Sequence, residues 1–296
     1  MAIRITQNML NNNMLRNLHN SMGNMDKLQE QLSSGRKVNR PSDDPVIATR
    51  GMYYRSSLIE NEQYQRNADE ASSWMDITDQ TMDEIGNIFK RVSELLVYSG
   101  NGGLSTEDRQ TMAMEITELK NQLGNLANTT VNGRYIFAGT DTTTPPYNPT
   151  VGDFTNTNAG EVKLEMSQNV FVPINVNPQA IFNYPDNANN VFKVLDNIIA
   201  ELNAGNSAAH HDTALTKQTD NLLAERAALG ARVNRIELVI DRLTRQEVTI
   251  TELQSKNEDA DEAEVITQLK MQESVHRAAL AAGARVIQPT LLDFLR

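Results

Sequence analysis

A chain of 296 residues, 39% of them apolar, is long enough to bury a sizeable core and to form one to three domains. Its net charge of −11, with no basic run longer than Arg36-Lys37, argues against nucleic acid and against an anionic membrane surface as partners. The absence of cysteine excludes disulfides, thiolate metal sites and thiol catalysis.

The N-terminal region, residues 1–44, predicts one helix followed by a break. Apolar residues recur there every three or four positions, which is the spacing of one helix face. Five asparagines lower the helix propensity, so we expect this helix to be marginal on its own. They are Asn11, Asn12, Asn13, Asn17 and Asn20. It ends at Ser33-Ser34-Gly35. The apolar positions are Leu10, Met14, Leu18, Met22, Met25, Leu28 and Leu32.

Residues 45–134 predict a first helical rod. Asp44 suits an N-cap and Pro45 the first helical position, and the pattern continues to about Tyr98. Its apolar stripe, which includes Ile85 and Val92, alternates steps of three and four as in the seam of a left-handed coiled coil. After the glycine-rich stretch 100–103, Ser105 with Asp108 predicts a capping box that opens a second helix.

The middle of the chain, residues 135–185, has a different pattern. Asn132-Gly133 is a turn dipeptide, and proline and glycine cluster from Gly139 to Gly160. Strict alternation over 161–166, continued over 170–176, predicts a β-hairpin. We therefore expect a small β-rich domain here.

Residues 186–254 predict the return rod, and residues 255–296 a polar break and a last helix. In the rod, apolar residues recur every seven positions, which is a coiled-coil seam. They include Leu222, Leu229, Ile236 and Leu243. The apolar positions of the last segment include Leu269, Val275, Leu280, Val286, Leu291 and Phe294.

The order of elements is nearly palindromic and predicts a mainly α fold with a small β-rich insert. Each rod can bury its seam only against the other or against a partner, and antiparallel pairing would form a coiled-coil-like bundle with both chain ends together. The terminal helices would then be detached and lack an intramolecular core. Such apolar helices bury themselves in another copy or partner.

A search for catalytic chemistry yields little. His210-His211-Asp212 resembles a metal corner, but no third ligand has a convincing spacing, so we expect no metal. The acidic pairs and runs at Asp43-Asp44 and 258–262 begin helices, where carboxylates cap free amides. We expect no catalytic residue and no cofactor, hence no enzyme. From periodicity alone, any homo-oligomeric coiled-coil scaffold remains open.

Three segments resemble motifs of the bacterial flagellin superfamily. They are LSSGRKVNRPSDDP from Leu32, the stretch from Glu225 to Arg235 with its R-x-x-L-G-A pattern, and the acidic break from Asn257 to Asp261. The resemblance implies a flagellin-like helical fold. It also implies export in an unfolded state by the flagellar type III apparatus, a secretion chaperone, and assembly through the terminal helices.

Two further stretches resemble the branch of that superfamily that joins hook to filament. They are Gly133 to Thr140 and the end from Gln288 to Leu295. This implies a ring of copies between the hook end, or other hook-associated proteins, and flagellin, outside the cell. The first eight residues lack the apolar stretch of a cleavable signal, and no window reaches the roughly 18 apolar residues of a membrane span. The alternative is a filament flagellin subunit.

Overall fold

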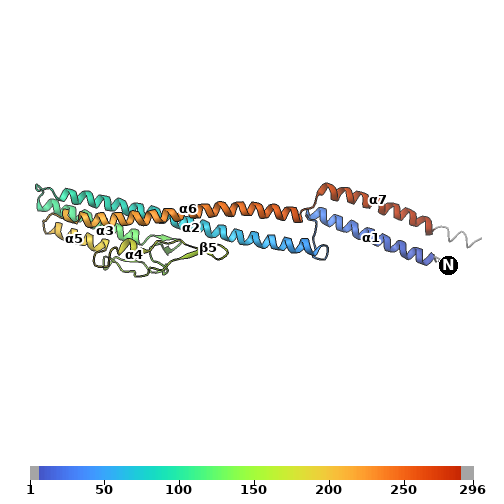
Figure 1. Ribbon diagram of the computed structural model, residues 1–296, viewed down its shortest axis with the longest axis horizontal. Coiled ribbons are helices and arrows are strands. Elements are labelled where there is room, and N and C mark those ends of the chain that lie inside the picture. The colour runs from blue at the N-terminus through green and yellow to red at the C-terminus, as the bar shows by residue number, and fades with distance from the viewer. Residues whose placement is uncertain (1–6, 288–296) are drawn as a thin grey trace, which may run out of the picture. The chain divides into compact units, whose positions relative to one another are not determined.

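The computed structural model describes residues 7–287, most of which are helical (Figure 1). The helices are α1 (Gln7–Ser34), α2 (Pro45–Ser99), α3 (Thr106–Ala127), α4 (Pro178–Phe182), α5 (Val191–Asn203), α6 (Asp212–Glu258) and α7 (Glu262–Ile287), with a 3-10 turn η1 at Ala209–His211. The strands are β1 (Thr130–Val131), β2 (Arg134–Tyr135), β3 (Tyr147–Asn148), β4 (Asp153–Phe154), β5 (Lys163–Ser167) and β6 (Val170–Pro173).

The chain divides into two compact units. One is continuous and covers residues 61–245. The other combines the two ends of the chain, up to residue 60 and from residue 246. We call the first the rod unit and the second the terminal unit. Among residues 7–287, no helix is both long and apolar enough to cross a lipid bilayer.

Within the rod unit, α6 runs antiparallel to α2. Near one end of the pair, the Asn61 side-chain amide donates to the Leu243 carbonyl over 3.1 Å. Near the other end, the Ser93 hydroxyl donates to the Asp212 carboxylate over 2.9 Å. Residue numbers rise along one helix as they fall along the other, which confirms the predicted antiparallel rods.

The seam residues predicted from the heptad pattern lie in the hydrophobic core of the rod unit. Each is at most 3% exposed. Trp74 and Phe89 of α2 belong to the same core. The six predicted positions are Ile85, Val92, Leu222, Leu229, Ile236 and Leu243.

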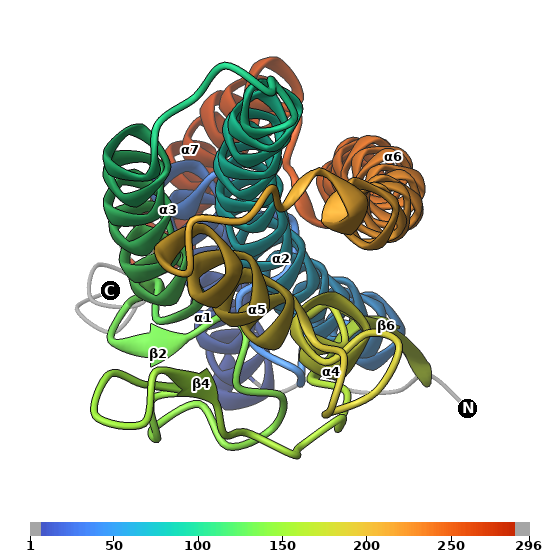
Figure 2. The same ribbon diagram turned by 90° about the vertical axis from the view of Figure 1, so that its left-hand side faces the viewer.

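Helices α3 and α5 lie next to each other and beside α2, as the view along the rods shows (Figure 2). The predicted capping box is confirmed, since the Ser105 side chain accepts from the Asp108 amide and the Asp108 side chain accepts from the Ser105 amide. The Ser105 hydroxyl and amide thereby lower the pKa of the Asp108 carboxyl. Helix α3 is joined to α5 by an ion pair of 2.6 Å between Lys120 and Asp196.

The predicted hairpin over residues 161–176 is present as β5 and β6, which pair antiparallel with Glu165 opposite Phe171. The strands described form three separate two-stranded sheets. The first of them begins at Thr130, ahead of the predicted range 135–185. Its turn residues Asn132 and Gly133 both have positive φ, as a two-residue hairpin turn requires.

Aromatic side chains join the insert to the helices rather than forming a core of its own. Phe182 packs edge-on against Phe137 and is stacked on Phe154 within the insert. Phe182 and Tyr147 are each also stacked with Phe192 of α5. Tyr147 also lies against α3, where a Cβ added at Gly124 would be 2.2 Å from its ring. These aromatic residues belong to the same hydrophobic cluster as the rod seam, so the rod unit has one continuous core.

Candidate functional site

The terminal helices α1 and α7 lie side by side and antiparallel within the terminal unit (Figure 1). The Gln272 amide of α7 donates to the Ser21 hydroxyl of α1 over 3.2 Å. Near the free ends of the two helices, a Cβ added at Gly283 would lie 2.0 Å from Met14 Cε, so the glycine makes room for the methionine. Sequence reasoning expected no intramolecular partner for either helix. The structure instead pairs them with each other.

The assembly residues expected from the sequence are distributed over this helix pair. Met14, Leu18, Met25 and Leu269 are half-buried. Leu32, Val275 and Leu280 are 36%, 52% and 48% exposed. Leu10 and Val286 lie on α1 and α7, but their side chains are outside the described part of the chain, as are Leu291 and Phe294 altogether.

The pair leaves much apolar surface facing solvent. Other large apolar side chains on the two helices are 39–61% exposed, and two helices alone cannot cover both sides of each. Single exposed apolar residues are ordinary, but a dense set on one element marks an interaction surface. We call the set with Leu32, Val275 and Leu280 the terminal apolar face; its other members are Met9, Leu15, Met22, Ile266 and Met271.

The segment between α1 and α2 contacts the segment between α6 and α7, although the two are far apart in the sequence. The Lys37 amide donates to the Glu258 carbonyl over 2.6 Å, and the Ala260 amide donates to the Gly35 carbonyl over 2.8 Å. Arg36 and Asp259 thereby form an isolated antiparallel bridge. Gly35 has a φ of +69°, a conformation that favours glycine. We call this contact the terminal joint.

Glu258 is the buried charge of the terminal joint, at 4% exposure. Its carboxylate accepts from Arg55 over 2.7 Å and lies 3.9 Å from the Arg36 guanidinium. It occupies the space over Gly51, where a Cβ would be 1.6 Å from Glu258 Oε1. A buried carboxylate is tolerated only when paired in this way.

Sequence reasoning placed Glu258 in a polar break beginning at residue 255 and interpreted the acidic run as helix caps. For Asp261 this is confirmed, because its carboxylate accepts from the amides of Ala263 and Glu264 at the start of α7. Glu258 differs: α6 continues four residues past the predicted end at 254, up to Glu258. The sequence did contain a hint of this pairing. Gly51 and Arg55 lie one turn apart on the same face of α2, where the glycine leaves space for a side chain and the arginine can pair with a carboxylate.

Comparison with known proteins places both helical ends of the chain in one family. A family model for the bacterial flagellin N-terminal helical region matches residues 5–142, and one for the C-terminal helical region matches residues 212–295. The chain belongs to the bacterial flagellin family.

Two flagellin-family relatives and one solved structure span most of the chain. The chain is 31% identical to flagellar hook-associated protein 3 of Escherichia coli, over 94% of each sequence. It is 26% identical to flagellin of Bacillus subtilis, over 99% of this chain and 100% of that one. The structure of a putative flagellar hook-associated protein from Vibrio parahaemolyticus has the same fold, with a TM-score of 0.68 at 20% identity, covering 73% of this chain and 100% of that chain.

The family assignment makes this chain a structural component of the bacterial flagellum and not an enzyme. Its rod motif from Glu225 to Arg235 has a structural role. Arg226 donates to Asp79 over 2.7 Å and to Asp83, which raises the pKa of its guanidinium. Leu229 is in the seam, and Arg232 donates to the Asn175 carbonyl over 2.9 Å. The motif thus joins α6 to α2 and to the insert.

Replacing Glu258 by alanine is expected to loosen the terminal joint. The change leaves Arg55 and Arg36 without their carboxylate and opens space above Gly51. Arg55 is 46% exposed and can be rehydrated, so the expected loss is about 1–3 kcal/mol. Hydrogen exchange at the Ala260 amide measures this loss, as a rate increase of about fivefold or more. Glu262→Ala, at an exposed residue, serves as the control. Equal exchange in both variants would show that the buried carboxylate does not hold the joint.

Proposed function

We propose that this chain is the junction subunit that joins the hook to the filament. The single observation that carries the proposal is the 31% identity to flagellar hook-associated protein 3 over 94% of both chains. The terminal apolar face supports it, because a subunit that assembles through its ends needs exposed apolar surface there before assembly.

The proposed partners follow from that role. Copies of the chain form a ring that contacts the hook end or another hook-associated protein on one side and flagellin on the other. A secretion chaperone covers the terminal apolar face before export, and the type III apparatus passes the unfolded chain out of the cell. Nucleic acid and membrane are not among the partners, consistent with a net charge of −11.

A junction subunit differs from a filament subunit in how its contacts repeat. A filament subunit is self-complementary along a helical lattice, so its contacts never close and the polymer grows. A junction subunit presents one surface to the hook and another to flagellin, and adds as a limited layer. One observation supports the alternative function, filament flagellin: the chain is similar to Bacillus subtilis flagellin over 99% of its length.

A strain that lacks the gene is expected to assemble hooks, release unpolymerised flagellin into the medium and be non-motile. Electron microscopy of the cells and immunoblots of the medium check this. Restoring the gene on a plasmid is the matched control.

A second experiment uses purified protein, which should form only short caps when it is added to hook fragments. Unlimited polymerisation from the protein's own seeds would replace the junction assignment by filament flagellin. Normal filaments on the deletion strain would replace it by a minor paralogue of flagellin.

A further inference from the structure

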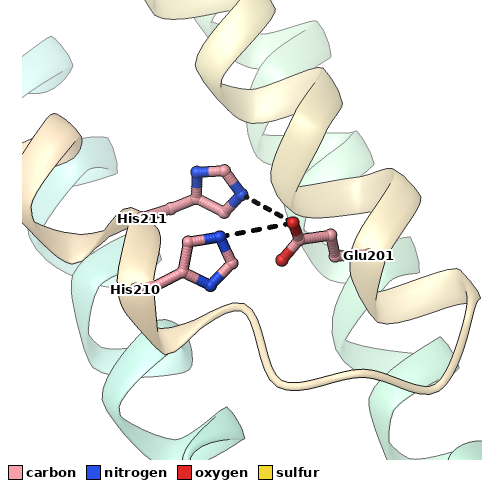
Figure 3. A group of neighbouring side chains, drawn as sticks. All are labelled: Glu201, His210 and His211. Atoms are coloured by element: carbon pink, nitrogen blue, oxygen red, sulfur yellow. Dashed lines mark ion pairs between the residues drawn. The ribbon is translucent and has the colours of Figure 1, made fainter.

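Three potential metal ligands meet at the corner between α5 and α6. Glu201 lies in the last turn of α5, and His210 and His211 form the turn η1 directly before α6. Both imidazole rings approach the same carboxylate oxygen (Figure 3). Nε2 of His210 and Nε2 of His211 are each 3.3 Å from Glu201 Oε1. The histidine pair was apparent from the sequence. The third potential ligand, Glu201, was identified only from the structure, in which the turn η1 lies next to the end of α5.

The two nitrogen–oxygen separations match those of a tetrahedral metal site. Zinc binds imidazole nitrogen and carboxylate oxygen at about 2.0–2.2 Å, so two ligand atoms of a tetrahedron lie about 3.3–3.5 Å apart. Both nitrogen–oxygen separations are 3.3 Å, and the three ligand atoms all lie within 4.8 Å of one another. Two histidines and a carboxylate form a ligand set that zinc uses in proteins, with water completing the coordination.

The cluster also contains polar atoms that the protein itself does not satisfy. His211 Nε2 and Glu201 Oε2 are buried and have no hydrogen-bond partner, although His211 Nε2 lies 3.3 Å from Glu201 Oε1. A buried polar atom without a partner costs about 1–3 kcal/mol, and such atoms call for an ion or a water.

We propose that Glu201, His210 and His211 bind a zinc-class transition-metal ion. The ion would fasten the start of α6 to the end of α5 across the loop of residues 204–208. His210, at 63% side-chain exposure, gives the ion a path from solvent, while His211 at 17% is held by the fold. The site lies wholly within the rod unit and does not depend on the junction function.

The test uses the full chain, freed of metal with a chelator and then titrated with Zn²⁺ in a calorimeter and with Co²⁺ in a spectrophotometer. We expect one ion per chain, and visible absorption of tetrahedral Co²⁺ that Zn²⁺ displaces. Zinc should also raise the melting temperature, since it binds the folded state. The variants are Glu201→Gln, His211→Ala and His210→Ala. His19→Ala, an exposed histidine on α1, is the matched control.

Loss of affinity by about tenfold or more in each cluster variant, with the control unchanged, supports the site. Far-UV circular dichroism checks that Glu201→Gln is folded; should it unfold, the exposed His210→Ala variant decides. Two results would overturn the proposal. One is the absence of a stoichiometric binding event in the unmodified chain. The other is a folded Glu201→Gln, or a His210→Ala, variant that binds as tightly as the unmodified chain.

Discussion

Replacing Ile236 by aspartate is expected to remove most of the folding stability of the rod unit. Ile236 is fully buried in the seam between α6 and α2. An aspartate there places an unpaired carboxylate in an apolar core and removes buried methyl groups, which together cost several kcal/mol. Because native proteins are stable by only about 5–15 kcal/mol, a loss of this size brings the unit close to unfolding. Urea unfolding followed by circular dichroism measures the loss.

The same helix offers a matched control two residues away. Leu238 is 68% exposed, so Leu238→Asp introduces the same charge without burying it. Its free energy of unfolding should stay within about 0.5 kcal/mol of the unmodified chain. If both variants unfolded at the same urea concentration, helix propensity or net charge would explain the effect, and the seam would not be the main source of stability.

The seam was predictable because its repeat is local. Residues seven positions apart lie on the same face of a helix. The spacing of Leu229 and Ile236 therefore predicts the buried face of α6 even when the partner helix is unknown. Caps are equally local, and both Asp44 and Ser105 occupy the predicted positions: the Asp44 carboxylate accepts from the Val46 amide at the start of α2. What these patterns lack is the identity of the facing residue.

Contacts between distant residues were not predictable from one sequence. The Glu258–Arg55 pair joins residues 203 apart, and a carboxylate in an acidic run looks like a cap until its partner is known. The hairpin β5–β6 was predictable from its alternation, but β1 to β4 have two residues each, too short for a periodic pattern. Side chains of the insert are ordered by aromatic contacts such as Phe137 with Phe182. Glu201 was missed as a ligand because the intervening loop has no regular repeat that would orient it toward η1.

The terminal unit presents the opposite case to the seam, since its exposed apolar residues contribute little to the stability of the free chain. Val275 on α7 is 52% exposed, so Val275→Asp should leave the unfolding of the purified monomer within about 0.5 kcal/mol of the original. In the assembled state the same residue is expected to be covered by a neighbouring subunit. An aspartate would then be buried without a partner, at a cost of several kcal/mol for every copy added.

Val275→Asp, expressed in the deletion strain, is therefore expected to be made but not incorporated, leaving cells without filaments. Ser274→Asp adds the same charge at an adjacent, exposed polar position and should restore filaments. Microscopy, immunoblots of the medium and a thermal melt of each purified variant give the readouts. A lowered melting temperature for Val275→Asp would place this residue in the monomer's own core. Normal filaments with Val275→Asp would instead show that Val275 is not buried between subunits, which argues against the terminal apolar face as an assembly surface. An unpaired aspartate buried in such an interface would weaken assembly.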